Sequence, residues 1–220
     1  MIRRNGLDIC LLGFLIFSAG CVPISKTIPI SGSPDDLPGC YTLFPSKPWE
    51  SVHRIEATLG GGGGGFFSVL GVTKGEPSDR QLQSLLLTPE GFILFDAERR
   101  NGEVTVRKAV PPFDSPAFAK GLMEDVALLF LPPQAKPASW RRDANGAMIC
   151  NWEGPEDPHT EITGSTDSGW QILQRDKQGQ VIKEVALSGP FVNGLASRME
   201  LRASKPASYR LRMTLVQPSP

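Results

Sequence analysis

Large apolar residues in this sequence are concentrated in two short runs, at residues 85–87 and 92–95, which are separated by only four residues. Each run is too short for a helix and consists of large side chains, so each predicts a β-strand. Pro89, Glu90 and Gly91 between the runs predict a tight turn, because proline presets one backbone angle and glycine accepts the left-handed one. The hairpin over residues 82–95 is therefore apolar on both faces near its tip. An antiparallel sheet with one face in water alternates apolar and polar residues, so something must cover each face of this hairpin.

Residues 115–131 predict the one convincing helix of the chain. Ser115 followed by Pro116 is a typical helix start, and two prolines directly after residue 131 end the helix. Apolar residues recur at helical spacing within it, namely Phe118, Leu122, Val126, Leu129 and Phe130. Neighbouring side chains on a helix diverge by about 100°, so Glu124 and Asp125 predict a solvated helix face rather than a catalytic pair. We expect this helix to cover one side of the hairpin, and a ligand to cover part of the rest.

The rest of the chain predicts short strands separated by turns. Asn101-Gly102 is a strong hairpin turn signal. The clearest strand is at residues 209–216, where Tyr209, Leu211 and Met213 alternate with polar residues. Further strands are predicted at residues 41–44, 49–59, 66–70, 104–110, 147–153, 160–163, 169–174, 181–187 and 195–203. Strands do not alternate with helices, so the prediction is a mainly β (α+β) fold with an antiparallel sheet and one helix.

The first twenty residues have the layout of an export signal. A basic start is followed by a short apolar run and by Ser18, Ala19 and Gly20 directly before Cys21. A cut directly before a cysteine resembles the lipobox of bacterial lipoproteins, in which the cysteine becomes a diacylated N-terminus. Two acyl chains would anchor the protein stably, at about 0.8 kcal/mol per buried methylene. The alternative is an ordinary signal peptide that is cut nearby. By the same resemblance, Val22 after the cysteine favours the outer membrane and a domain that faces the periplasm.

The predicted division of the chain is a signal peptide at residues 1–20, a flexible tether at 21–38 and one domain at 39–220. The tether contains four prolines, with serine, glycine and aspartate between them, and would reach about 50 Å at ~3.1 Å per residue. Without the signal peptide the chain keeps 21 basic and 22 acidic residues, because Arg3, Arg4 and Asp8 are removed. No basic excess indicates a nucleic-acid partner.

Two cysteines remain in the predicted domain, Cys40 and Cys150. An even pair in an exported domain is compatible with a disulfide, and equally with two separate buried thiols. The sequence contains two histidines and no paired Cys/His spacing, so no metal site is predicted. The glycines at residues 60–65 are not followed by Lys-Ser or Lys-Thr, so we interpret them as a flexible connection rather than a phosphate loop.

The stretches LLLTPEGFILFDAERRNGEVTV and SRMELRASKPASYRLRM, with an amphipathic helix between them, resemble the family of the outer-membrane lipoprotein receptor LolB and the periplasmic carrier LolA. The resemblance covers residues 51–216. It implies a strongly curved, unclosed antiparallel β-barrel with a helical lid, and an interior that holds acyl chains. The implied cavity-lining residues are Phe67, Leu85, Leu87, Phe92, Leu94, Phe118, Leu122, Val126, Phe130, Leu211 and Met213. The same residues would form an ordinary packed core if no ligand binds.

The tip of the hairpin departs from the receptor pattern. Glu90 stands where the receptor carries an exposed leucine, and a carboxylate is costly to move into hydrocarbon. We therefore expect a divergent family member that handles another lipid or acylated product.

Three classes of function are compatible with this sequence to different extents. The first is binding of lipid or lipoprotein acyl chains for transfer or insertion at the outer membrane, with a periplasmic carrier as a further candidate partner. The second is an assembly or scaffold lipoprotein with a filled core. An enzyme is not predicted, because no Gly-x-Ser-x-Gly motif or acyl-transfer constellation is present, and no catalytic residue or cofactor is expected.

Overall fold

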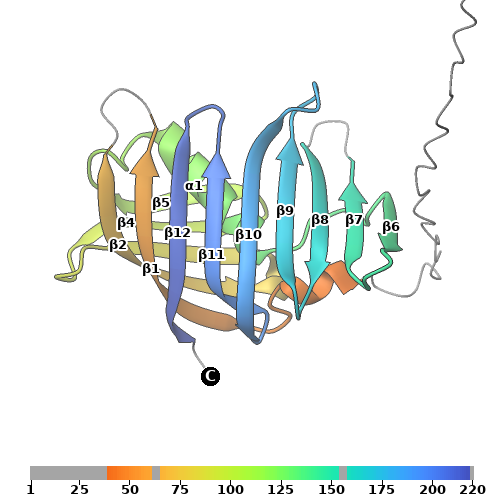
Figure 1. Ribbon diagram of the computed structural model, residues 1–220. Coiled ribbons are helices and arrows are strands. Elements are labelled where there is room, and N and C mark those ends of the chain that lie inside the picture. Colours follow the sequence, from red (N-terminus) through yellow and green to blue (C-terminus); the bar gives the residue numbers. More distant parts are fainter. Residues whose placement is uncertain (1–38, 61–64, 154–157, 219–220) are drawn as a thin grey trace, which may run out of the picture.

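The computed structural model describes residues 39–60, 65–153 and 158–218, which form one twelve-stranded antiparallel sheet and one α-helix (Figure 1). The strands are β1 (Trp49–Leu59), β2 (Phe66–Glu76), β3 (Gln81–Leu87), β4 (Ile93–Arg100), β5 (Glu103–Ala109), β6 (Ser139–Arg142), β7 (Met148–Trp152), β8 (His159–Ser165), β9 (Gly169–Arg175), β10 (Val181–Val192), β11 (Leu195–Ala203) and β12 (Tyr209–Pro218). The helix is α1 (Pro116–Phe130), and two 3₁₀ helices are η1 (Gly39–Leu43) and η2 (Pro77–Asp79).

The sheet is strongly curved and is not closed. The strand order is β5-β4-β3-β2-β1-β12-β11-β10-β9-β8-β7-β6. Each strand pairs with the next strand in the chain, except that β5 does not pair with β6, and β1 pairs in addition with β12. The two free edges are thus β5 and β6, and the segment between them contains α1. Figure 1 shows β2 to β5 turning behind β11 and β12, with α1 lying in the space between. This confirms the predicted fold class.

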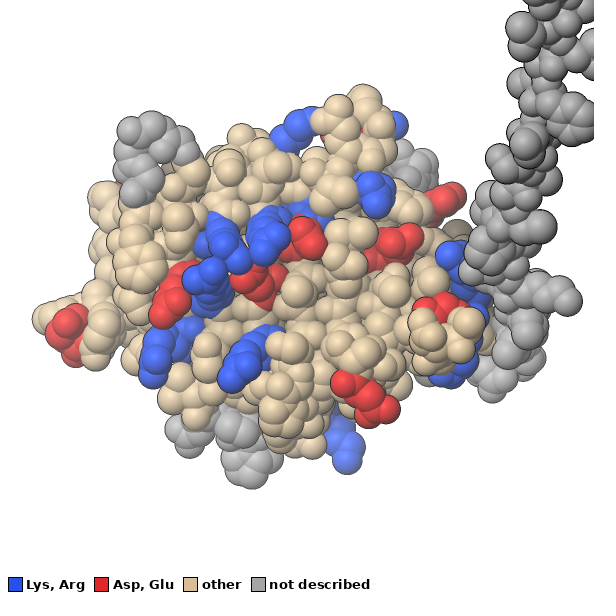
Figure 2. All heavy atoms as spheres, viewed as in Figure 1, with Lys and Arg blue, Asp and Glu red and all other residues tan. Residues whose placement is uncertain are grey.

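Alternation along the strands separates an inner face, which packs around α1, from an outer face. In β3 the buried residues are Leu82, Ser84 and Leu86, and their partners across β4 include the buried Phe95. The outer face of β10 to β12 is polar, as the alternation at residues 209–216 predicts. Figure 2 shows Lys, Arg, Asp and Glu side chains gathered over these strands. The core therefore lies on the side of the sheet that faces α1.

Several predicted elements are confirmed and some are wrong. The predicted helix matches α1 within one residue at each end, and the Asn101-Gly102 turn joins β4 to β5 with positive φ at both residues. Residues 41–44, predicted as a strand, lie largely in η1 instead, where the Thr42 hydroxyl donates to the Gly39 carbonyl and Pro45 prevents an extension. Strand β6 was not predicted, because its four residues show no apolar alternation.

Cys40 and Cys150 form a disulfide with a Cα–Cα distance of 6.4 Å. It joins η1 to β7, and both cysteines are fully buried. Of the two alternatives that the sequence left open, the structure contains the bridge. The signal peptide, Cys21, the tether and residues 61–64 of the glycine run lie outside the described residues.

Candidate functional site

The candidate site is the contact between α1 and the inner face of the sheet. The helix begins where the sequence predicts, because the Ser115 side chain caps it by accepting a hydrogen bond from the Phe118 amide at 3.1 Å. Pro116 occupies the first turn, where a missing N–H costs nothing. At the other end, Arg80 from the β2–β3 connection donates to the Pro132 carbonyl at 2.9 Å. The cap therefore fixes where the helix begins, and the Arg80 contact ties the segment after its end to the β2–β3 connection.

Seven of the eleven predicted lining residues belong to the apolar core of the domain. Phe130 is fully buried, with its ring 4.7 Å from that of Trp49 and 5.7 Å from that of His53. Met213 is also buried. Half-buried members that pack against the same core are Phe67, Leu94, Leu122, Val126 and Leu211. These residues therefore form part of one packed core, to which α1 also contributes.

The predicted placement of Leu85 and Leu87 is wrong. Both lie on the outer face of β3 and do not pack against the core, whereas Leu86 between them does. The run of three leucines gives no alternation from which to choose a face. The register decides instead, because Leu86 pairs with the buried Phe95 and Leu87 pairs with Ile93, with a bulge between them.

Two predicted lining residues lie at the surface of the protein rather than in its interior. Phe92 is 70% exposed beside the hairpin turn, and Phe118 is 37% exposed. Phe118 contacts the buried Phe113 edge-on at a centroid distance of 5.3 Å, and Phe113 in turn contacts Phe67 at 6.2 Å. The end of the helix–sheet contact is thus lined by aromatic side chains that reach solvent.

The hairpin tip has the geometry that its sequence predicts. The Gly91 amide donates to the Thr88 carbonyl at 2.9 Å, and Gly91 has a φ of 92°, which favours glycine. Pro89, Glu90 and Gly91 are all exposed. A hydrogen bond from the Thr88 side chain lowers the pKa of Glu90, so the tip carries a full negative charge at neutral pH.

A buried polar cluster, absent from the sequence prediction, attaches α1 to the far half of the sheet. Asp125 of α1 accepts from the Lys183 ammonium at 2.6 Å and from the Tyr209 hydroxyl. Burial and the neighbouring Asp125 charge raise the pKa of Tyr209, so the phenol remains a hydrogen-bond donor. We predicted Asp125 on a solvated face. The signal against this was its position three residues after Leu122 and four before Leu129, within the apolar stripe.

A second set of polar groups lies buried on β1 beneath the end of α1. Trp49, Ser51 and His53 are all buried, and the Ser51 hydroxyl oxygen lies 3.4 Å from Nδ1 of His53. Among the described residues, neither Nε1 of Trp49 nor Nε2 of His53 has a hydrogen-bond partner. Burial lowers the pKa of His53 to about 4, so the ring is neutral at physiological pH.

His53 makes stability depend on pH in a defined window. Its pKa lies below the unfolded value of 6.5, so the unfolded chain binds more protons between pH 6.5 and 4. The stabilisation that the folded state gains from keeping His53 neutral is complete above pH 6.5. It is lost as the pH falls towards 4, by about 3 kcal/mol in total. We expect chemical unfolding of His53→Gln to show a correspondingly flatter pH dependence than the wild type. His159→Gln, at a half-exposed site, is the control, and equal slopes in wild type and His53→Gln would contradict the assignment.

Two surface hollows of about 400 Å³ lie near the start of β3, and no α1 residue lines either. Their walls are mainly polar, and Gln81 contributes to both. Within the described ranges, no group of three His, Cys, Asp or Glu residues could hold a metal ion. In the same part of the chain, no helix is both long and apolar enough to cross a bilayer.

No family model matches this sequence, and no curated protein matches it. Among solved structures, the chain is similar to the LolA superfamily protein NE2245 from Nitrosomonas europaea. The TM-score is 0.46 at 8% identity, over 82% of this chain and 89% of that chain. A similarity at this level assigns neither a family nor a function.

Proposed function

We propose that the protein is a membrane-anchored periplasmic lipoprotein that binds an acyl chain between α1 and the inner face of the sheet. The anchor would be a lipid on Cys21, at the outer membrane. The cargo would be a lipid or an acylated protein, and the protein would move it or insert it without chemistry. Burial of the chain would supply the free energy, at about 0.8 kcal/mol per methylene.

The observation that carries this proposal is the way α1 is attached. In the chain the helix lies between β5 and β6, the two edge strands of the sheet, and it takes part in no strand pairing. Displacing it would therefore break side-chain packing, the Arg80 contact and the Asp125 cluster, but no ladder of backbone hydrogen bonds. An acyl chain that replaces the apolar side of α1 over the inner face would restore much of the burial that displacement removes.

The exposed aromatic end supports an entry point at the start of α1. Phe118 in the first turn of the helix and Phe92 near the hairpin tip already present apolar surface to solvent. Between the sheet and the helix, Phe67 and Phe113 continue this surface inward. An acyl chain entering here would meet apolar side chains throughout.

The test is uptake of a fluorescent sixteen-carbon fatty acid by the protein with Cys21→Ser, which removes the proposed anchor. We expect saturable binding of one probe per chain, seen by fluorescence and by native mass spectrometry. Leu122→Gln should weaken uptake by about tenfold or more, because it places an amide against the chain without a partner. Glu124 lies two residues after Leu122, on the exposed side of the helix. Glu124→Gln should therefore leave uptake unchanged.

Two results would contradict acyl binding. One is a clean unliganded mass with no uptake of the probe at any concentration. The other is equal weakening by Leu122→Gln and Glu124→Gln, which would place the probe outside the helix–sheet contact. The first result would favour the scaffold function, which the complete burial of Phe130 also supports.

A further inference from the structure

The outer face of β1 to β4 carries an apolar block that nothing in the described structure covers. Its two cross-strand rows are set by the register of the four strands. The first row is Val52, Val72, Leu85 and Asp96, and the second is Arg54, Leu70, Leu87 and Ile93. The six aliphatic residues are half-buried, and none packs against the core. We call these eight residues the outer block.

The outer block differs from the rest of the outer face. Over β11 and β12 that face is charged, with Glu200 accepting from Arg202 at 2.7 Å and from Arg210 at 2.8 Å. Figure 2 shows this charged region. Contiguous aliphatic surface can mark a site of interaction, and these six half-buried residues are contiguous across four strands. The block therefore has the character of an interface core.

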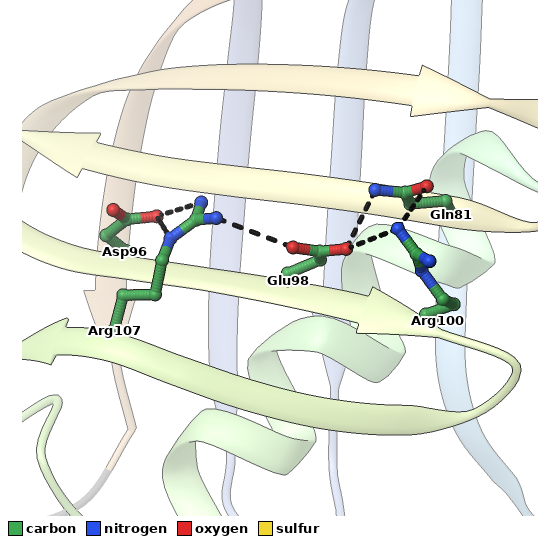
Figure 3. A network of polar contacts seen from close by, with 5 residues as sticks. All are labelled: Gln81, Asp96, Glu98, Arg100 and Arg107. Atoms are coloured by element: carbon green, nitrogen blue, oxygen red, sulfur yellow. Dashed lines mark hydrogen bonds and ion pairs between the residues drawn. The ribbon is translucent and has the colours of Figure 1, made fainter.

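Polar networks of both signs border the block. On the β4 side, Arg107 donates to Asp96 at 2.7 Å, and Glu98 accepts from Gln81 at 2.7 Å. Figure 3 shows this network in front of the strands, on the side opposite α1. A bilayer or a nucleic acid favours a border of basic residues, whereas a border of mixed sign is typical of a protein–protein interface.

The two charged residues of the block identify which protein fits. Arg54 and Asp96 occupy diagonally opposite corners, with the aliphatic residues between them. Consider a two-fold axis that lies in the plane of the face and perpendicular to the line from Arg54 to Asp96. It superimposes Arg54 of one copy on Asp96 of a second, and stacks the aliphatic residues of the two copies. The surface is thus complementary to itself in apolarity, and Arg54 of one copy faces an Asp96 carboxylate that also accepts from Arg107 of its own chain.

We propose that the outer block is the contact surface of a symmetric homodimer, in which two sheets stack face to face. The Arg54–Asp96 contact occurs twice in this dimer, once on each side of the two-fold axis. The block spans about 14 Å across four strands and about 7 Å along them. This is smaller than a standard interface of about 800 Å² per partner, so the polar border must also contribute, and the dissociation constant is on the order of micromolar.

The experiment is sedimentation velocity of the full exported chain carrying Cys21→Ser, from about 1 to 200 μM, which brackets a micromolar dissociation constant. We expect a concentration-dependent change from monomer to dimer. Leu85→Lys should weaken the dimer by about thirtyfold or more, because it places a charge in the interface core. Ala186→Lys introduces the same charge at an exposed outer position of β10 and should leave the dimer unchanged. Circular dichroism verifies that both variants are folded.

A charge exchange tests the geometry of the contact. Arg54→Asp and Asp96→Arg should each weaken the dimer by about tenfold, and the double variant should recover most of this loss. Failure of the double variant to recover would overturn the two-fold arrangement. A wild type that stays monomeric throughout would overturn the dimer. So would monomers that bind phosphatidylglycerol vesicles through Leu85, because the block would then be a membrane contact.

Discussion

Replacing Asp125 with alanine is expected to lower the free energy of unfolding by about 3–5 kcal/mol. The side chain is almost fully buried and accepts from both Lys183 and Tyr209, so its removal leaves a half-buried ammonium and a half-buried phenol without their partner. The Lys183 side chain is only 12% exposed, so its ammonium would be poorly solvated without the carboxylate. Urea unfolding followed by tryptophan fluorescence would measure the change.

Two further variants separate this cluster from the helix as such. Glu124→Ala removes the neighbouring carboxylate, which is exposed and lies 4.0 Å from Lys120, and should change stability by less than about 0.5 kcal/mol. The double variant Asp125→Ala/Lys183→Met should regain much of the lost stability, because it removes the unpaired charge as well. If Asp125→Ala were as mild as Glu124→Ala, the cluster would contribute nothing to the attachment of α1.

The attachment of α1 shows what helical periodicity can and cannot predict. The bounds of the helix followed from Ser115, from Pro116 and from the two prolines beyond residue 131. The apolar stripe was visible too, but the partners of Asp125 lie 58 and 84 residues further along the chain. A carboxylate within an apolar stripe indicates that it has a partner inside the protein. Which residues become its partners, here Lys183 and Tyr209, depends on how the sheet curves around the helix.

The hairpin over residues 82–95 shows a different limit. Its existence, its turn and its apolar character on both faces were all predictable, and so was the need for a cover. The inner side is covered by α1, as expected. Which leucines face inward was not predictable, because consecutive leucines fit either face and a bulge near Leu94 shifts the register. The predicted ligand-side residues Leu85 and Leu87 consequently belong to the outer block.

The helix contact and the outer block lie on opposite faces of the same strands. Leu86 packs towards α1, while its neighbours Leu85 and Leu87 point outward. A dimer through the outer block would hold β1 to β4 in a fixed curvature and would use the face opposite α1. Acyl binding beneath α1 and self-association are therefore sterically compatible, and each can fail its own experiment without affecting the other.

Removal of the disulfide is expected to cost about 4–5 kcal/mol of stability, because the bridge closes a loop of about 110 residues in the unfolded chain. The loop runs from η1, before the first strand, to β7, and so contains five strands that lie together at one end of the sheet order, together with α1 and β6. Cys40→Ala/Cys150→Ala removes both sulfurs and leaves no unpaired thiol. Urea unfolding under non-reducing conditions would measure the loss.

The physical origin of this effect can be tested within the same experiment. If the bridge acts through the unfolded chain, wild type treated with a reductant should lose as much stability as the double variant loses, apart from the contribution of the alanine cavities. The two sulfurs are fully buried between η1 and the sheet, where Met148 also lies against Gly39. A loss below about 1 kcal/mol would show that native packing holds η1 in place without the bridge, and that the unfolded chain is already compact around these residues.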